Sequence, residues 1–337
     1  MKKLLILMIV CLFSSCKESP KPTLHIFTWS EMLDADLVHQ FEEENGCRVV
    51  IDLYDSNESM YAKVKLGNSS YDILFPSNYY LEIMEKQGMV KKLDLELIPN
   101  HIYLDRAYFS SEANPYGIPF MVSYSGIGYR ADKVEMDHPS YTIFSSMKYS
   151  GRMTILNDVR EALGAALRTL GVSVNTLNQE AIEAAADLLI QWKQNLAKFE
   201  NEQYKNGLIN GEFLVSQSYS SDILQVQTET DKIAFGYPKE GAILSIEYIT
   251  IPESSPHPDL AHAFINFMIE PTSAAINIQR THALTPVTKS YPLLPNHLRN
   301  SPILFPSAEQ MESMEKIRDL GSDVLLYYRA WERVKGS

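Results

Sequence analysis

Three strand–helix units follow one another near the start of the chain, and this alternation is the feature that most limits its fold. The strand-like runs cover 24–28, 48–53 and 71–75, and the helix-like segments run from Asp34 to Gly46, from Ser56 or Asn57 to Gly67, and from about Tyr80 to Gln87. Such alternation predicts a mostly parallel sheet covered by helices, which is the α/β class. Ligands of that class bind at the carboxyl ends of the strands.

A second α/β region is expected after a crossover at 116–128. It begins with a strand at 152–156 and a helix that Asn157 or Asp158 caps and Gly171 ends. The further elements expected are a long helix at 179–195, strands at 213–215, 233–235 and 243–251, and helices at 258–269 and 308–333. A chain of 337 residues favours two lobes, because a single core rarely grows to this size.

Charge and motifs disfavour nucleic-acid binding and catalysis. The net charge is −12, whereas a phosphate backbone calls for a cationic surface. The sequence has no nucleophile elbow, Walker loop, zinc motif or Cys-x-x-Cys, so neither an enzyme nor a metal or other cofactor is predicted. The glycines of 126–131 match a loose dinucleotide pattern, but no amphipathic helix follows them.

The N-terminus resembles the signal of a bacterial lipoprotein. Lys2 and Lys3 precede the apolar run 4–13, which is too short to span a bilayer, and Ser14 and Ser15 precede Cys16. We expect residues 1–15 to be a signal peptide, Cys16 to carry the lipid, and 16–22 to be a tether. Cys47 would then be the lone thiol of the folded body, where a small buried side chain is expected.

Pairs of acidic or aromatic residues stand at expected strand ends and helix starts. The pairs are Trp29 with Glu31, Tyr79 with Tyr80, Asp158 with Glu161, Tyr219 with Asp222, and Glu247 with Tyr248. Each alone has a structural explanation; for example, Asp158 and Glu161 fit a helix cap and its capping box. Together they suit an organic diamine or triamine, because carboxylates compensate buried ammoniums and aromatic faces pack on the methylenes.

Several motifs then resemble one known family over nearly the whole mature chain and in the same order. They are Phe27-Thr-Trp-Ser-Glu31, the segment 54–63, Tyr71-Asp-Ile-Leu-Phe-Pro-Ser-Asn-Tyr-Tyr80, Asp158-Val-Arg-Glu161, Tyr237-Pro-Lys-Glu-Gly241 and Leu284-Thr-Pro286. The chain resembles the spermidine/putrescine-binding proteins of bacterial ABC transporters. This resemblance implies a type II periplasmic-binding fold with two lobes, each a mixed sheet covered by helices, and the ligand in the cleft. The implied lobes are 23–124 with about 248–293, and 125–247 with about 294–337.

The resemblance also implies roles for individual residues. Trp29 and Tyr79 would be aromatic walls, and Ser30 and Ser77 polar contacts. The first lobe would supply Glu31, which pairs with an ammonium. The remaining implied ligand residues are Asp158, Glu161, Tyr219, Asp222 and Glu247.

The sequence departs from the family at three places where that family commonly has aromatic residues. Met32, Ser245 and Ala283 occupy these positions. The acids are therefore better retained than the aromatic walls, which still favours a cationic ligand.

The predicted function is that of a monomeric, non-catalytic lipoprotein held to a membrane in the periplasm, which delivers putrescine or spermidine to an ABC permease. Two alternatives remain open at this point. One is binding of another cation, such as ferric iron through Tyr79 and Tyr80 with a carboxylate. The other is a surface lipoprotein with a role in adhesion or sensing.

Overall fold

The computed structural model describes residues 21–67, 70–110, 112 and 115–337, so the expected signal peptide and Cys16 lie outside the described residues. The strands are β1 (Thr23–Thr28), β2 (Arg48–Leu53), β3 (Ile73–Leu74), β4 (Ile118–Arg130), β5 (Met153–Ile155), β6 (Leu196–Phe199), β7 (Val215–Tyr219), β8 (Ile233–Gly236), β9 (Ile243–Ile249) and β10 (Glu315–Lys316). No helix within the described ranges is both long enough and apolar enough to cross a membrane.

The helices cover these strands from both faces. They are α1 (Ala35–Asn45), α2 (Asn57–Lys65), α3 (Asn78–Lys86), α4 (Val159–Thr169), α5 (Gln179–Lys193), α6 (Gln203–Asn210), α7 (Ser220–Val226), α8 (Pro258–Met268), α9 (Pro271–Thr281), α10 (Asn296–Arg299), α11 (Ala308–Ser313) and α12 (Val324–Gly336). Short 3-10 helices lie at Leu95–Leu97, Pro99–Tyr103, Tyr141–Ser145, Met147–Tyr149, Thr288–Leu293 and Gly321–Asp323.

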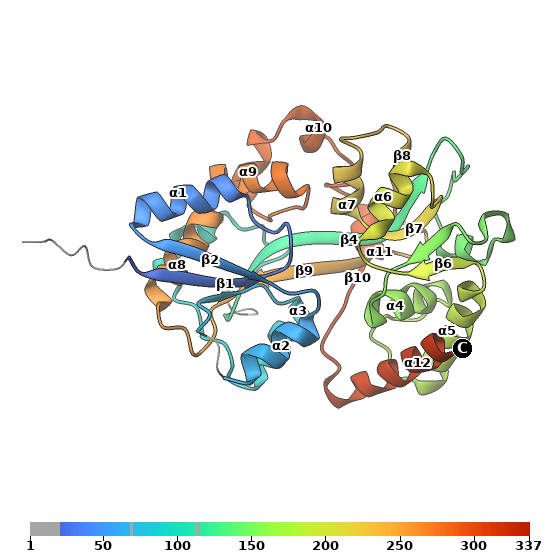
Figure 1. Cartoon of the computed structure of the whole chain (residues 1–337), viewed down its shortest axis with the longest axis horizontal. Coiled ribbons are helices and arrows are strands. Elements are labelled where there is room, and N and C mark those ends of the chain that lie inside the picture. The colour runs from blue at the N-terminus through green and yellow to red at the C-terminus, as the bar shows by residue number, and fades with distance from the viewer. Residues whose placement is uncertain (1–20, 68–69, 111, 113–114) are drawn as a thin grey trace, which may run out of the picture.

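The strands form two sheets, and one hydrophobic cluster contains residues of both, such as Phe27 of β1 and Tyr124 of β4. The first has the order β2-β1-β3 with both pairings parallel, and isolated antiparallel bridges connect its edge to β9. The second has the order β10-β9-β4-β7-β5-β6 and is mixed, with β8 paired to β4. The long strands β4 and β9 pair along their length and run across the molecule from one sheet to the other (Figure 1). The predicted α/β fold with two sheets covered by helices is therefore confirmed.

Side-chain caps explain why the predicted helices begin and end where they do. Asp34 accepts hydrogen bonds from the backbone at the start of α1, and Gly46 ends that helix in the left-handed conformation with φ of 58°. Ser56 caps α2 and Asp158 caps α4 in the same manner. These caps place the first residues after β2 and β5 at the edge where the strands end.

Three sequence predictions differ from the structure. The segment 116–128, expected as a crossover, lies largely within β4, which continues to Arg130. The single helix expected at 308–333 is broken into α11, β10 and α12. The strand expected at 213–215 begins at Val215 and extends to Tyr219, which moves Tyr219 into the sheet.

The glycines of the dinucleotide-like pattern lie in β4, where the absence of a side chain lets neighbouring residues pack closely. A Cβ atom at Gly126 would lie 2.6 Å from Cζ of Phe235, and one at Gly128 would lie 2.5 Å from Cδ1 of Ile223. These glycines are in a paired strand rather than in a loop before a helix. Cys47 is buried and free, as expected.

Candidate functional site

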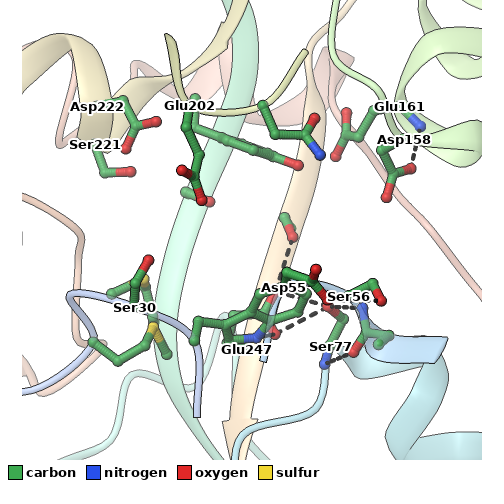
Figure 2. A pocket seen from close by; sticks show the side chains of 18 of the residues that line it. Ser30, Asp55, Ser56, Ser77, Asp158, Glu161, Glu202, Ser221, Asp222 and Glu247 are labelled. Carbon is green, nitrogen blue, oxygen red and sulfur yellow. Dashed lines mark hydrogen bonds between the residues drawn. The ribbon is translucent and has the colours of Figure 1, made fainter. Parts of the chain in front are cut away.

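A pocket of about 450 Å³ lies where the strands of both sheets end. Trp29 and Tyr54 directly follow β1 and β2, Ser77 follows β3, and Asp158 follows β5. Figure 2 shows Asp158, Glu161 and Asp222 along one wall, with Glu247 and Ser77 on the wall that faces them. The position agrees with the rule that ligands of α/β proteins bind at the carboxyl ends of strands.

All ten residues that the sequence nominated as ligand contacts line this one pocket. They are Trp29, Ser30, Glu31, Ser77, Tyr79, Asp158, Glu161, Tyr219, Asp222 and Glu247. The structure thus brings them together, while their contact with a ligand stays a prediction. Of the three positions that depart from the family pattern, Met32 and Ser245 line the pocket, whereas Ala283 is buried and is not among its lining residues.

The carboxylate of Glu247 is held in place by three side chains. Ser77 donates from Oγ at 2.8 Å and 3.0 Å from the two carboxylate oxygens, and Nε1 of Trp29 donates at 3.1 Å. Ser245 contributes a longer bond of 3.4 Å. Burial nevertheless raises the pKa of Glu247 to about 7, and these hydrogen bonds limit the rise.

Asp158 and Glu161 lie at the first turn of α4. Oδ1 of Asp158 accepts hydrogen bonds from the backbone nitrogens of Arg160 and Glu161 at 2.8 Å and 3.0 Å, so its capping role is confirmed. Glu161 behaves differently, because its Oε2 atom is buried and has no hydrogen-bond partner among the described residues. Burial, together with the charge of Asp158, raises the pKa of Glu161 to about 8.

The guanidinium of Arg160, which lies between these two acids in the sequence, forms its hydrogen bonds with other residues. Arg160 donates to the carbonyl oxygens of Arg318 and Val174 at 3.1 Å and 3.2 Å, and to Oδ1 of Asn175 at 2.9 Å. It packs over the ring of Tyr327 at 4.7 Å. Arg160 therefore anchors the C-terminal segment, and its hydrogen bonds do not go to the carboxylates of Asp158 and Glu161.

Aromatic side chains form much of the remaining wall. The rings of Trp29 and Tyr54 lie 4.6 Å apart, and those of Tyr79 and Tyr80 lie 5.0 Å apart. Asn57 donates to the hydroxyl of Tyr79 at 3.4 Å. Burial raises the pKa of Tyr79 well above its ordinary value, so its phenol is neutral at physiological pH.

The ferric-iron alternative calls for Tyr79 and Tyr80 together, but Tyr80 is not among the residues that line the pocket. Within the described residues, no group of three or more His, Cys, Asp or Glu side chains is placed to hold a metal.

The other end of the pocket contains a positive charge. Nζ of Lys205 lies 3.3 Å from Oε2 of Glu31 and 3.3 Å from Oε1 of Gln225. Glu31 has a φ of 59°, a left-handed conformation that is uncommon outside glycine. Asp222 accepts a hydrogen bond from the hydroxyl of Tyr204; burial raises its pKa, and the charge of Lys205 opposes that rise.

Sequence reasoning missed several pocket residues besides Lys205. They include Asp55, Asn57, Glu58, Ser123, Glu202, Gln225, Arg280 and Tyr328. Asp55, Asn57 and Glu58 follow β2, so the rule that ligands bind at strand ends identifies that segment as a candidate. Lys205 and Gln225 lie on α6 and α7, two helices that the hydrophobic pattern did not predict.

Comparison with known proteins supports the resemblance seen in the sequence. The spermidine/putrescine-binding periplasmic protein of Escherichia coli K12 is 30% identical over 320 residues, which cover 93% of this chain and 91% of that protein. A putative spermidine/putrescine ABC transporter structure from Listeria monocytogenes superimposes with a TM-score of 0.87 at 27% identity, covering 94% of this chain and 99% of the other.

The Tp0655 (TpPotD) lipoprotein of Treponema pallidum superimposes with a TM-score of 0.83 at 28% identity, covering 93% of this chain and 99% of that one. The model of the bacterial extracellular solute-binding protein family matches residues 36–306. Members of this family bind solutes and are not enzymes, in agreement with the absence of a catalytic motif from the sequence. The chain belongs to the family of bacterial extracellular solute-binding proteins.

Proposed function

We propose that this protein is the component of an ABC importer that captures putrescine or spermidine and delivers it to a membrane permease. The observation that carries the proposal is a set of three carboxylates, those of Asp158, Glu161 and Glu247, which line one pocket with Trp29 and Tyr79. We name these three residues the deep acidic cluster. Their chemistry selects a cation, and the aromatic rings beside them select one with hydrocarbon spacers.

The energetics of the deep acidic cluster favour an organic ammonium. Burial raises the pKa of all three carboxyl groups, so the pocket holds their negative charge at a cost when no ligand is bound. An ammonium that enters supplies the missing opposite charge and donates hydrogen bonds, for which Oε2 of Glu161 is a free acceptor among the described residues. The relatives bear names of polyamine-binding proteins, which agrees with this chemistry.

A second part of the proposal concerns how ligand binding is communicated to the permease. We propose that residues 23–124 with about 248–293, and 125–247 with about 294–337, close on the ligand as a monomer. Support comes from Ser77 of the first range, which lies on the wall facing Asp158, Glu161 and Asp222 of the second (Figure 2). Glu247, at the boundary of the two ranges, lies beside Ser77. A ligand held by both walls stabilises the closed form, which the permease recognises.

Titration calorimetry tests the function. The protein from Lys17 onward, refolded after denaturation to remove any carried-over ligand, is titrated with putrescine, spermidine and spermine. We expect a dissociation constant of about 1 μM or lower for at least one amine, which corresponds to about −8 kcal/mol. Failure of a folded sample to bind any of the three would reject a polyamine as the ligand.

We further propose that Cys16 carries a lipid that holds the protein to a membrane in the periplasm. Support comes from the signal-like residues 1–15 and from the lipoprotein of Treponema pallidum among the related structures. Metabolic labelling of the full chain with an alkyne fatty acid tests this. Label that is present in the wild type and lost in Cys16→Ser is the expected result, and equal labelling of both would exclude Cys16 as the attachment site.

A further inference from the structure

The pocket contains a lysine as well as its acids, and the charges are divided between its two ends. At one end, Lys205 forms an ion pair of 3.3 Å with Glu31, and its side chain is only 24% exposed. Asp222 and Glu202 line the same pocket, and the charge of Lys205 acts on the carboxyl of Asp222. This end of the pocket therefore holds a cation that belongs to the protein.

Unlike Glu31, the carboxylates of the deep acidic cluster have no ion-pair partner among the described residues. Asp158, Glu161 and Glu247 line one pocket, and the charge of Asp158 raises the pKa of both Glu161 and Glu247. Among the ion pairs of the described residues, none involves Asp158, Glu161 or Glu247. In Figure 2, Asp222 lies at one end of the wall and Asp158 at the other.

On the basis of the proposed function, we infer that Lys205 determines specificity by restricting the pocket to short diamines. Both ammoniums of a short diamine are compensated at the deep acidic cluster, between Glu247 on one wall and Asp158 and Glu161 on the other. A triamine or tetramine places an additional ammonium toward Glu31. There Lys205 repels it, and the carboxylate that it needs is already paired.

The surroundings of Lys205 also exclude the simplest other role for this residue, which is pairing with a ligand carboxylate. Its ammonium already contacts Glu31 and Gln225, and Asp222 and Glu202 line the same pocket. A ligand carboxylate that approached Lys205 would come close to Glu31, Asp222 and Glu202; Arg280 is a further cation that lines the pocket. Such a ligand would have to displace Glu31 and remain beside like charges, which is unfavourable.

The experiment compares putrescine and spermidine by titration calorimetry on wild type, Lys205→Gln and Glu31→Gln. We expect wild type to bind putrescine at least tenfold more tightly than spermidine. Lys205→Gln should reduce this ratio at least tenfold, because Glu31 is then free to accept an ammonium. Glu31→Gln should increase the ratio, because it leaves Lys205 unpaired, so the two variants shift selectivity in opposite directions.

The matched control is Lys232→Gln, an exposed lysine outside the pocket, which should keep the wild-type ratio. Circular dichroism verifies that each variant is folded.

A ratio that Lys205→Gln leaves unchanged, or equal binding of both amines by wild type, would overturn the inference while leaving the proposed function intact. Tighter binding of 4-aminobutanoate than of putrescine, lost in Lys205→Gln, would also overturn it. Absence of any amine binding by folded wild type would instead overturn the proposed function and this inference together.

Discussion

The indole of Trp29 donates a hydrogen bond of 3.1 Å to Oε2 of Glu247, a residue 218 positions further along the chain. The same indole nitrogen lies 3.0 Å from the carbonyl oxygen of Phe75, and Ser77 donates to both oxygens of Glu247. The carboxylate is therefore fixed before a ligand arrives. A preorganised acceptor loses little conformational entropy on binding, so Glu247 is the candidate ligand residue on which we base the first prediction.

The first prediction concerns the charge of Glu247. Glu247→Gln keeps the shape of the side chain but removes its negative charge, which leaves a bound ammonium without its partner. Losing one partner of a buried charge pair costs about 2–5 kcal/mol, so we expect affinity for the preferred amine to fall about 30-fold or more. Titration calorimetry measures the change.

Glu253→Gln is the matched control, because Glu253 is a surface residue paired with Lys91 and lies outside the pocket. It should bind the amine as wild type does. Equal affinities of Glu247→Gln and wild type would remove Glu247 from the site.

The second prediction is that amine binding releases protons near neutral pH. The pKa of Glu161 is about 8 and that of Glu247 is about 7 in the ligand-free protein, so both carry substantial proton occupancy at pH 7. A bound ammonium favours the ionised carboxylates and expels these protons. Affinity should therefore rise with pH through 7 and 8, over which range a primary alkyl ammonium remains protonated, as the lysine side chain with its pKa of about 10.4 does.

Calorimetry in two buffers of different ionisation enthalpy measures the release. At pH 7 the observed binding enthalpy should differ between the buffers, and the difference should shrink at pH 9. Glu161→Gln should release fewer protons than wild type. A binding enthalpy that is the same in both buffers at pH 7 would contradict the raised pKa values.

The third prediction is that removing the charge of Glu161 stabilises the ligand-free protein at alkaline pH. The pKa of Glu161 in the fold, about 8, lies above its ordinary value of 4.5. Stability linked to this group is thus fully present below pH 4.5 and is lost as pH rises through 8. Glu161→Gln avoids this loss, so its melting temperature should exceed that of wild type by several degrees at pH 9, at about 2–4 °C per kcal/mol.

At pH 4.5 the two proteins should melt within about 1 °C of each other, because Glu161 is then protonated in wild type. Glu135→Gln, at an exposed position, provides the control for removal of a surface charge. A variant that melts lower than wild type at pH 9 would show that Glu161 is ionised and well compensated in the ligand-free pocket.

The parts of the fold that sequence reasoning predicted well are those with local signals. Asp34 begins α1 by accepting hydrogen bonds from the backbone of its first turn, and Gly46 ends the helix in the left-handed conformation. Asp158 caps α4 in the same local manner. Because such caps follow strands in this fold class, the sequence could also place Trp29, Asp158 and Tyr219 at one edge before their contacts were known.

Sequence reasoning predicted poorly those parts of the fold that depend on long-range contacts. A helix was expected through Glu315, but that carboxylate accepts hydrogen bonds from Ser173, Asn175 and the backbone of Val174, and the chain there pairs with β9 as a short strand. Lys205 was missed for a related reason. Nothing in the local sequence distinguishes a lysine that faces a pocket from one that faces solvent, and only the fold brings it to Glu31.

The fourth prediction concerns Gly126, which the sequence placed in an expected crossover and the structure places inside β4. A Cβ atom there would lie 2.6 Å from Cζ of Phe235 and 2.8 Å from the carbonyl oxygen of Gly236. The backbone atom belongs to the paired strand β8 and cannot move without disturbing that pairing. Gly126→Ala should therefore lower the free energy of unfolding by about 1–3 kcal/mol, as overpacking does.

Urea unfolding followed by circular dichroism measures this loss as a lower midpoint. Gly336→Ala is the matched control, because a Cβ atom there would meet nothing within 4 Å and the residue ends α12. The control should unfold within about 0.5 kcal/mol of wild type, which is typical of surface substitutions. If Gly126→Ala has the same midpoint as the control, β4 and β8 do not approach as closely at this position as the structure requires.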